Sequence, residues 1–273
     1  MRAGRWLFVV NGEFLAANCP PQALAAACTQ GGLDPSAYRL PIHPLLIETD
    51  SQRILLDTGN GVRYRALRPD AGQLLAALRA EGIAPEAINV VPLTHLHLDH
   101  IGGAVDDAGA PTFPTARYLV GRTEYEFWWA KPSLDELPFP VERRQFLREA
   151  AKDLLVALQG RIEQVAPGDA IAPGITAVAA PGHTPGHLAV ELASGEERAL
   201  HVVDAAAEPT LHLGHADWFL APDLWPVEAL RTRRALLDRA AAEDLLVLTA
   251  HFPFPGVGRV RADGDGWRWT AVA

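Results

Sequence analysis

The strongest constraint on the fold of this chain is a histidine-rich segment that directly follows an apolar run. Residues 88–93 are apolar enough for a buried strand, and three histidines and an aspartate then fall within six residues: His95, His97, Asp99 and His100. A single histidine carries little information. A cluster of imidazoles with a carboxylate after a strand indicates a metal site, because histidine is the commonest metal ligand in proteins.

The spacing within this cluster favours two metal ions. Side chains alternate along an extended chain, so His95 and His97 point to the same side and can bind one metal. Asp99 and His100 fall where the chain turns toward Gly102, and they can therefore face a second point. Two adjacent metals explain this arrangement better than one.

Further candidate ligands follow other predicted strands. They are His183 after the strand 175–180, Asp204 after the strand 199–203, and His251 after the strand 245–249. Glycine and proline on both sides of His183 predict a rigid turn that presents this side chain. Each of these residues alone would more often be structural, but their recurrence at strand ends favours one shared site.

The rest of the chain alternates predicted strands and helices. Residues 45–48 and 53–56 form a predicted hairpin, helices are expected over 72–81, 141–158 and 226–243, and further strands over 113–120 and 267–272. This order predicts an α/β protein in which helices cover sheets. A length of 273 residues suits one large domain or two fused halves, and we expect a single domain over residues 1–273.

Composition excludes several classes of protein. The formal net charge of −9 argues against a nucleic-acid-binding protein, and no apolar run approaches the roughly 20 residues that cross a bilayer. Residues 1–10 are expected to form a first strand that enters a hairpin, not a signal peptide. Cys19 and Cys28 could pair, but two cysteines do not suggest a disulfide scaffold, so we expect unpaired thiols in the cytoplasm.

The histidine cluster resembles a known family. Residues 95–100 resemble the HxHxDH signature of the metallo-β-lactamase superfamily, residues 182–187 are similar to its next motif, Asp204 to its bridging aspartate and His251 to its last histidine. The order and spacing agree over about residues 45 to 255. Residues 251–258, 266–269 and 123–128 resemble the methyl parathion hydrolase-like branch.

The resemblance implies an αββα sandwich of two mixed sheets flanked by helices, a homodimer, and a dinuclear centre. It assigns His95, His97 and His183 to the first metal, Asp99, His100 and His251 to the second, and Asp204 to both. Three nitrogen ligands with an open fourth position are the pattern of catalytic zinc. Imidazoles and carboxylates without a thiolate also suit manganese, iron or cobalt.

Supporting residues are expected around the ligands. The family places a buried carboxylate that orients a ligand histidine at Asp57, with an ordinary turn aspartate as the alternative, and Thr94 and His187 are similar candidates. Aromatic residues in irregular segments can form an apolar substrate pocket, with core packing as the alternative. The candidates are Phe127, Trp128, Trp218, Phe219 and Phe252.

These observations predict a hydrolase of small carboxylic esters or lactones, with phosphotriester hydrolysis as a side activity. A metal-bridging hydroxide would attack the carbonyl or phosphoryl centre, and Asp99 would accept its proton. Many acyl-homoserine lactonases carry a tyrosine three residues after the bridging aspartate, whereas residues 205–207 here are all alanine, which argues against a dedicated lactonase of that type. The alternative is a primary organophosphate phosphotriesterase; a β-lactamase or a di-iron oxidoreductase of the same fold is less favoured.

Overall fold

The computed structural model of the chain describes residues 6–66 and 71–272. The chain divides into two compact units. Unit 1 is built mainly from Ile42–Ile171, and unit 2 from Leu7–Pro41 with Ala172–Ala273. The prediction of one domain over the whole chain stays a prediction.

Unit 1 contains a sheet of five strands within the described residues. Their spatial order is β3 (Leu45–Glu48), β4 (Arg53–Leu56), β5 (Val90–Leu93), β6 (Arg117–Gly121) and β7 (Ile162–Val165). The first two form the predicted antiparallel hairpin, and the strands from β4 to β7 run parallel. All four residues of β5 are buried, which is the usual state of a parallel strand covered on both faces.

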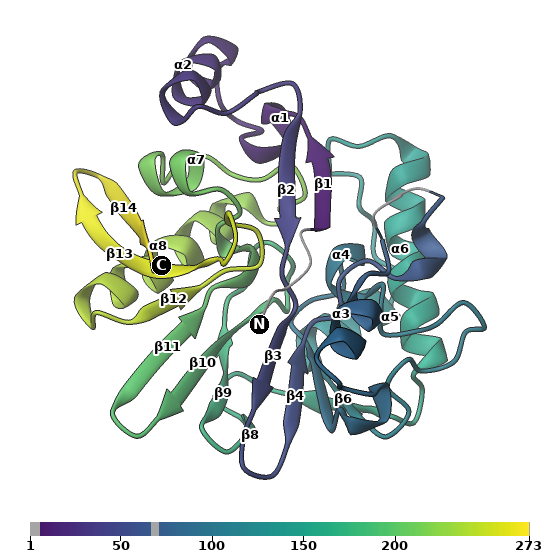
Figure 1. Cartoon of the computed structure of the whole chain (residues 1–273). Helices are drawn as coiled ribbons and strands as arrows, with labels where there is room; N and C mark the ends of the chain where they lie inside the picture. The colour runs from purple at the N-terminus through teal and green to yellow at the C-terminus, as the bar shows by residue number, and fades with distance from the viewer. Residues whose placement is uncertain (1–5, 67–70, 273) are drawn as a thin grey trace. The chain divides into compact units, whose positions relative to one another are not determined.

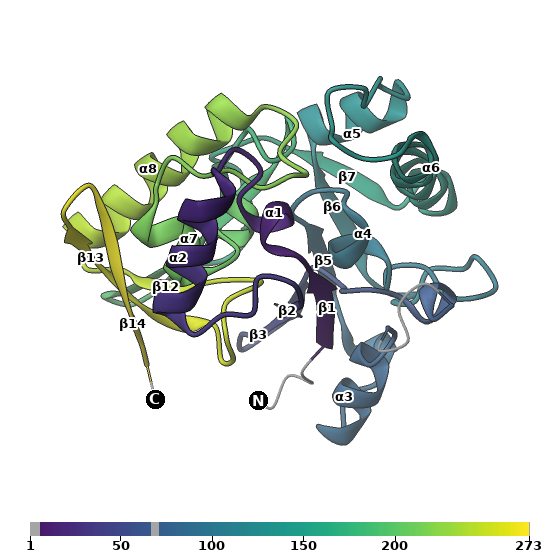
Figure 2. The same cartoon turned by 90° about the horizontal axis from the view of Figure 1, so that it is seen from above.

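Helices complete unit 1. They are α3 (Leu74–Ala80), α4 (Leu98–Ile101), α5 (Arg122–Trp129) and α6 (Val141–Ala157), with short 3-10 turns at Val62–Tyr64 and Pro85–Ala87. Helix α6 buries Ala150, Ala151, Leu154 and Leu155 at helical spacing. It packs against both α4 and α5, and Figure 2 shows α5 and α6 side by side.

Unit 2 contains a sheet of seven strands within the described residues. Their spatial order is β14 (Gly266–Ala271), β13 (Val257–Asp263), β12 (Leu246–Leu248), β11 (Glu197–His201), β10 (Leu188–Ser194), β9 (Ile175–Ala179) and β8 (Ala170–Ala172). The pair β11–β12 is parallel. A parallel pair needs a crossover connection, and the chain between these strands supplies α7 (Pro209–Gly214) and α8 (Pro226–Ala242).

The core of unit 2 lies between α8 and its sheet. Leu236, Leu237 and Ala240 on one face of the helix join a buried cluster with Leu200 and Val247 from the strands. Helix α8 packs against β13 and against the 3-10 turn Val203–Ala205, and Figures 1 and 2 show it alongside the C-terminal strands. Helix α8 is therefore in direct contact with the turn that carries Asp204.

The N-terminal prediction was wrong in one respect. Strand β1 (Trp6–Val10) exists, although residues 1–5 lie outside the described residues. It is followed by α1 (Gly12–Leu15) and α2 (Pro21–Gly31) in place of a hairpin turn, and β1 pairs instead with β2 (Tyr38–Ile42). The reason is Asn11, whose side chain accepts the Phe14 N–H and caps a helix.

Several strand limits also differ from the prediction. The predicted strand 113–120 begins only at Arg117, because the Ala116 N–H donates to the Phe113 carbonyl in a turn. The predicted strand 199–203 ends at His201, and Asp204 lies in a 3-10 turn. Cys19 and Cys28 are both free thiols, as expected. No helix in the described ranges combines the length and hydropathy of a membrane span.

Candidate metal centre

The histidine-rich motif of unit 1 joins a strand to a short helix. Strand β5 ends at Leu93, and His97 is the extended residue that precedes α4. The imidazole centroids of His95 and His97 lie 4.8 Å apart, and those of His95 and His100 lie 4.1 Å apart. One ligand atom of Asp99 lies within 4.8 Å of one of His100. The turn into α4 therefore gathers the four predicted ligands of unit 1.

Asp57 orients the His100 imidazole. Its Oδ2 lies 2.8 Å from His100 Nδ1, and the same carboxylate accepts the N–H and the hydroxyl of Thr94. Asp57 has a φ of 59°, a conformation that aspartate tolerates better than most residues. Since Nδ1 faces a carboxylate, His100 Nε2 remains for a metal. The structure thus brings together Asp57, Thr94 and His100.

In unit 2, Asp204 lies between two imidazoles. Its Oδ2 is 3.1 Å from His183 Nε2, and its Oδ1 is 3.1 Å from His251 Nε2. All three side chains are buried. Each oxygen of the Asp204 carboxylate therefore faces a different imidazole.

The outer nitrogens of these histidines also face hydrogen-bond acceptors. His183 Nδ1 lies 2.7 Å from Asp223 Oδ1, and His251 Nδ1 lies 2.6 Å from the Pro41 carbonyl. These contacts direct both Nε2 atoms toward Asp204. Burial alone would lower the pKa of His183, but the carboxylates of Asp204 and Asp223 outweigh it and raise the pKa to about 9.

Sequence reasoning missed Asp223. Its second oxygen accepts the Leu220 N–H at 2.9 Å, so both carboxylate oxygens are used. Nothing in the local sequence separates it from an ordinary turn aspartate after a proline. Its role depends on a contact with His183, which lies 40 residues away.

His187 and Arg233 support the turn that carries Asp204. His187 Nδ1 faces the Ala180 carbonyl at 2.8 Å, and its Nε2 accepts the Asp204 N–H at 3.4 Å. Arg233 on α8 is buried and donates to the Ala205 carbonyl at 2.6 Å. The turn is strained, because Val203 has a φ of 50°, a conformation that branched residues rarely adopt.

Two histidines close to Asp204 in the sequence have other surroundings. His212 Nδ1 accepts the N–H groups of Ala207 and Glu208, and its Nε2 lies 2.7 Å from the Leu15 carbonyl. Burial lowers the pKa of His212, so it is a neutral core residue. His215 stacks on Trp218, with ring centroids 3.8 Å apart.

The five aromatic residues predicted for a substrate pocket differ in burial. Trp128 is fully buried and donates its indole N–H to Glu124 at 2.7 Å. Phe252 belongs to the core of unit 2, and Trp218 to a buried cluster with the N-terminal helices. Phe127 and Phe219 are half-buried. The core-packing alternative thus describes Trp128, Trp218 and Phe252.

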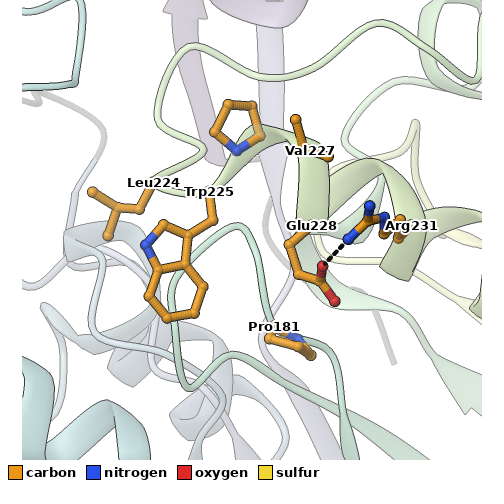
Figure 3. A pocket seen from close by; sticks show the side chains of 7 residues that line it. Pro181, Leu224, Trp225, Val227, Glu228 and Arg231 are labelled. Carbon is orange, nitrogen blue, oxygen red and sulfur yellow. Dashed lines mark hydrogen bonds and ion pairs between the residues drawn. The ribbon is translucent and has the colours of Figure 1, made fainter.

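A shallow hollow of about 500 Å³ lies in unit 2 beside the loop that leads to His183. Its described lining residues are Pro181, Leu224, Trp225, Pro226, Val227, Glu228 and Arg231. Figure 3 shows the indole of Trp225 on one side and the Glu228–Arg231 ion pair on the other. The N–H of Trp225 donates to the Gly182 carbonyl, and the N–H of Leu224 donates to the His183 carbonyl. Two lining residues of the hollow are therefore hydrogen-bonded to the loop that carries His183.

The ligand types fit divalent metal ions. The donors are imidazole nitrogens and carboxylate oxygens, and three of the imidazoles are oriented by acceptors at Nδ1. Such sets suit zinc and its neighbours in the first transition row.

Comparison with known proteins agrees with this chemistry. The family profile of the metallo-beta-lactamase superfamily matches residues 37–251. The chain is 31% identical over 255 residues to a probable metallo-hydrolase of Mycobacterium tuberculosis, covering 82% of this chain and 78% of that protein. It is 28% identical over 241 residues to the N-acyl homoserine lactonase AttM of Azorhizobium caulinodans, covering 79% and 83%.

Solved structures show the same relationship. The dizinc quorum-quenching lactonase AidC, in complex with a homoserine product, superposes with a TM-score of 0.91 at 26% identity and covers 98% of this chain and 92% of its own. The hydrolase AbOPH of the beta lactamase superfamily gives a TM-score of 0.88 at 25% identity, covering 100% and 96%. The predicted mixed α/β fold is confirmed. The chain therefore belongs to the metallo-beta-lactamase superfamily and is a metal-dependent hydrolase.

Proposed function

We propose that the protein opens the ring of N-acyl homoserine lactones or closely related lactones at a dinuclear zinc centre. The proposed ligands are those predicted from the sequence: His95, His97 and His183 for one metal, Asp99, His100 and His251 for the other, and Asp204 for both. The observation that carries the proposal is the pair of 3.1 Å distances that join the two oxygens of Asp204 to two different imidazoles.

The substrate class is supported by the relatives. Several of the similar proteins are N-acyl homoserine lactonases by name, and AidC is described as a dizinc lactonase. Residues 205–207 are buried alanines, so no phenol from these positions assists the reaction. We infer that the carbonyl oxygen is polarised without such a group.

Bound zinc would supply Lewis acidity and lower the pKa of a coordinated water. The protein's own contribution is orientation and proton transfer. Asp57 and Asp223 hold the His100 and His183 imidazoles. The Asp99 side chain is 23% exposed, so it can accept a proton from the attacking water and return it to the departing ring oxygen. In the net reaction, water adds across the ester C–O bond to give an alcohol and a carboxylic acid, which releases its proton to the solvent.

Metal analysis followed by a substrate panel tests this function. The purified protein is loaded with zinc, its metal content is measured by mass spectrometry, and hydrolysis of N-hexanoyl homoserine lactone, an aryl ester, paraoxon and a β-lactam is compared. We expect two zinc ions per chain and the highest kcat/KM for the lactone. A protein with two zinc ions that hydrolyses paraoxon faster than the lactone would establish the phosphotriesterase alternative instead.

Asp204→Asn tests the bridging role. It should bind fewer than two zinc ions and lose at least about 100-fold in kcat/KM, because oxyanion stabilisation by a metal is worth several kcal/mol. The control is Asp217→Asn, which changes an exposed aspartate in the same unit and should leave both quantities unchanged. Full metal content and full activity in Asp204→Asn would contradict the proposal.

Asp99→Asn tests the proton-transfer role. At full zinc occupancy, we expect its profile of rate against pH to differ from that of the unsubstituted protein, because an asparagine amide cannot accept the proton. An unchanged profile would remove Asp99 from this role.

The homodimer, the cytoplasmic location, and the methyl parathion hydrolase-like branch remain predictions. Sedimentation velocity would test the homodimer.

A further inference from the structure

Glu124 is a buried carboxylate outside the set of ligands and supporting residues predicted from the sequence. It lies in α5 and is 0% exposed. Its Oε1 accepts the Leu96 N–H at 2.9 Å and the Trp128 indole N–H at 2.7 Å. Burying a carboxylate costs free energy unless hydrogen bonds compensate for lost water. A residue that served only to fill this space would not need a hydrogen-bond acceptor.

The position of the Leu96 amide makes this contact important. Leu96 lies between His95 and His97, and a hydrogen bond to its N–H fixes the peptide plane that joins it to His95. The backbone here is a bend between β5 and α4, with no ladder of strand hydrogen bonds to hold it. The direction in which both imidazoles leave the backbone is therefore set in part by Glu124.

Trp128 completes the arrangement. It lies one helical turn after Glu124, so its indole can donate to the same oxygen. Its ring also meets the His97 imidazole edge-on, with centroids 6.0 Å apart. The helix thus contacts the motif twice, once at the Leu96 backbone and once at the His97 ring.

We propose that Glu124 is a positioning residue, which acts through the Leu96 amide to set the geometry of His95 and His97 toward a metal. This inference depends on the ligand assignment of the proposed function. In this role, the length of the Glu124 side chain matters, because its oxygen must come within hydrogen-bond distance of the Leu96 N–H. Its negative charge does not matter, as it would if Glu124 acted on the metal by electrostatics from a distance.

Two substitutions separate reach from charge. Glu124→Gln keeps the length and an acceptor oxygen but removes the charge. Glu124→Asp keeps the charge but shortens the side chain by one methylene. We expect Glu124→Gln to bind zinc within about threefold of the unsubstituted protein, and Glu124→Asp to bind about 10- to 100-fold more weakly, the usual cost of losing a partner behind a metal ligand.

Zinc affinity is measured by competition with a chromophoric chelator, and the visible spectrum of the cobalt-substituted protein reports ligand geometry. The spectrum should be unchanged in Glu124→Gln and altered in Glu124→Asp. Glu126→Gln and Glu126→Asp are matched controls on an exposed position of the same helix. Thermal unfolding of the metal-free proteins identifies any variant that fails to fold.

Should Glu124→Asp fail to fold, Trp128→Phe provides a second test, because it removes the indole N–H and leaves the carboxylate in place. We expect an altered cobalt spectrum from a folded protein. Weaker zinc binding by Glu124→Gln than by Glu124→Asp, or unaltered spectra in both Glu124→Asp and Trp128→Phe, would overturn the inference. Loss of zinc from His95→Ala tests the ligand assignment separately, so the two failures are distinguishable.

Discussion

At the scale of single residues, three of the proposed ligand histidines have a hydrogen-bond acceptor at Nδ1. Asp57 faces His100, Asp223 faces His183 and the Pro41 carbonyl faces His251. An acceptor at Nδ1 fixes the tautomer and leaves Nε2 as the metal-binding atom. Two of these acceptors are carboxylates, which strengthen the imidazole as a ligand.

Asp223→Asn tests one of these acceptors. Asp223 accepts from His183 on one oxygen and from Leu220 on the other, whereas an asparagine offers one oxygen and one N–H₂ group. One contact must therefore be lost, and we expect zinc affinity to fall by about 10- to 100-fold. Chelator competition measures the change, with Asp217→Asn as control. Equal affinity in the two variants would show that Asp223 does not orient His183.

Glu208 makes stability depend on pH. Burial raises its pKa from 4.5 to about 7, against hydrogen bonds from Leu211 and Thr210 that lower it. The folded state therefore holds the proton more tightly than the unfolded state. The protonated side chain therefore contributes about 3 kcal/mol to the free energy of unfolding below pH 4.5. This contribution is lost as the pH rises through 7.

Glu208→Gln should remove this dependence. We expect its free energy of unfolding in urea, relative to that of the unsubstituted protein, to rise between pH 4.5 and 7 when both are metal-free. Glu13→Gln, at an exposed position, should show no such trend. Parallel curves for Glu208→Gln and the unsubstituted protein would rule out the effect.

At the scale of elements, the sequence predicted those with long or regular patterns. The hairpin β3–β4 and the helices α6 and α8 lie within one residue of the expected limits. Helices α1 and α2 were missed. Helix α1 has only four residues and depends on the Asn11 cap, and α2 begins without a side-chain cap. Short elements gain little from propensity and depend on local contacts.

Gly61 shows how closely two elements of unit 1 approach. A Cβ at this position would lie 1.8 Å from the Gly102 carbonyl oxygen, at the end of α4, which carries Asp99 and His100. Gly61→Ala should therefore lower the free energy of unfolding by about 1–3 kcal/mol and weaken zinc binding. Gly214→Ala, where no atom lies within 4 Å, should be neutral or slightly stabilising. Urea denaturation and chelator competition measure both quantities, and equal stability of the two variants would contradict this packing argument.

At the scale of the whole molecule, the proposed ligands are distributed over both compact units, with four residues in unit 1 and three in unit 2. On that proposed assignment, metal binding would stabilise the folded state of the protein. At a free metal concentration 100 times the dissociation constant, one site contributes about 2.7 kcal/mol. Removal of the metals should lower Tm, and zinc should restore it.

Differential scanning calorimetry before and after treatment with a chelator measures this shift. A reference sample treated with chelator that has already been saturated with zinc controls for effects of the chelator itself. A Tm that does not change while the metal content falls to zero would mean that the metals do not contribute to the stability of either unit.

The sequence alone determined the family, the class of chemistry and the candidate ligands, because the histidine cluster 95–100 and the strand ends before His183, Asp204 and His251 are local features. Only the tertiary structure decided which side chains form hydrogen bonds to the candidate ligands or to the backbone beside them. Glu124 and Asp223 look like an ordinary helix residue and an ordinary turn residue, and their contacts join positions 28 and 40 residues apart. Local sequence patterns do not predict such contacts, because the contacts form only when the strands and helices pack together.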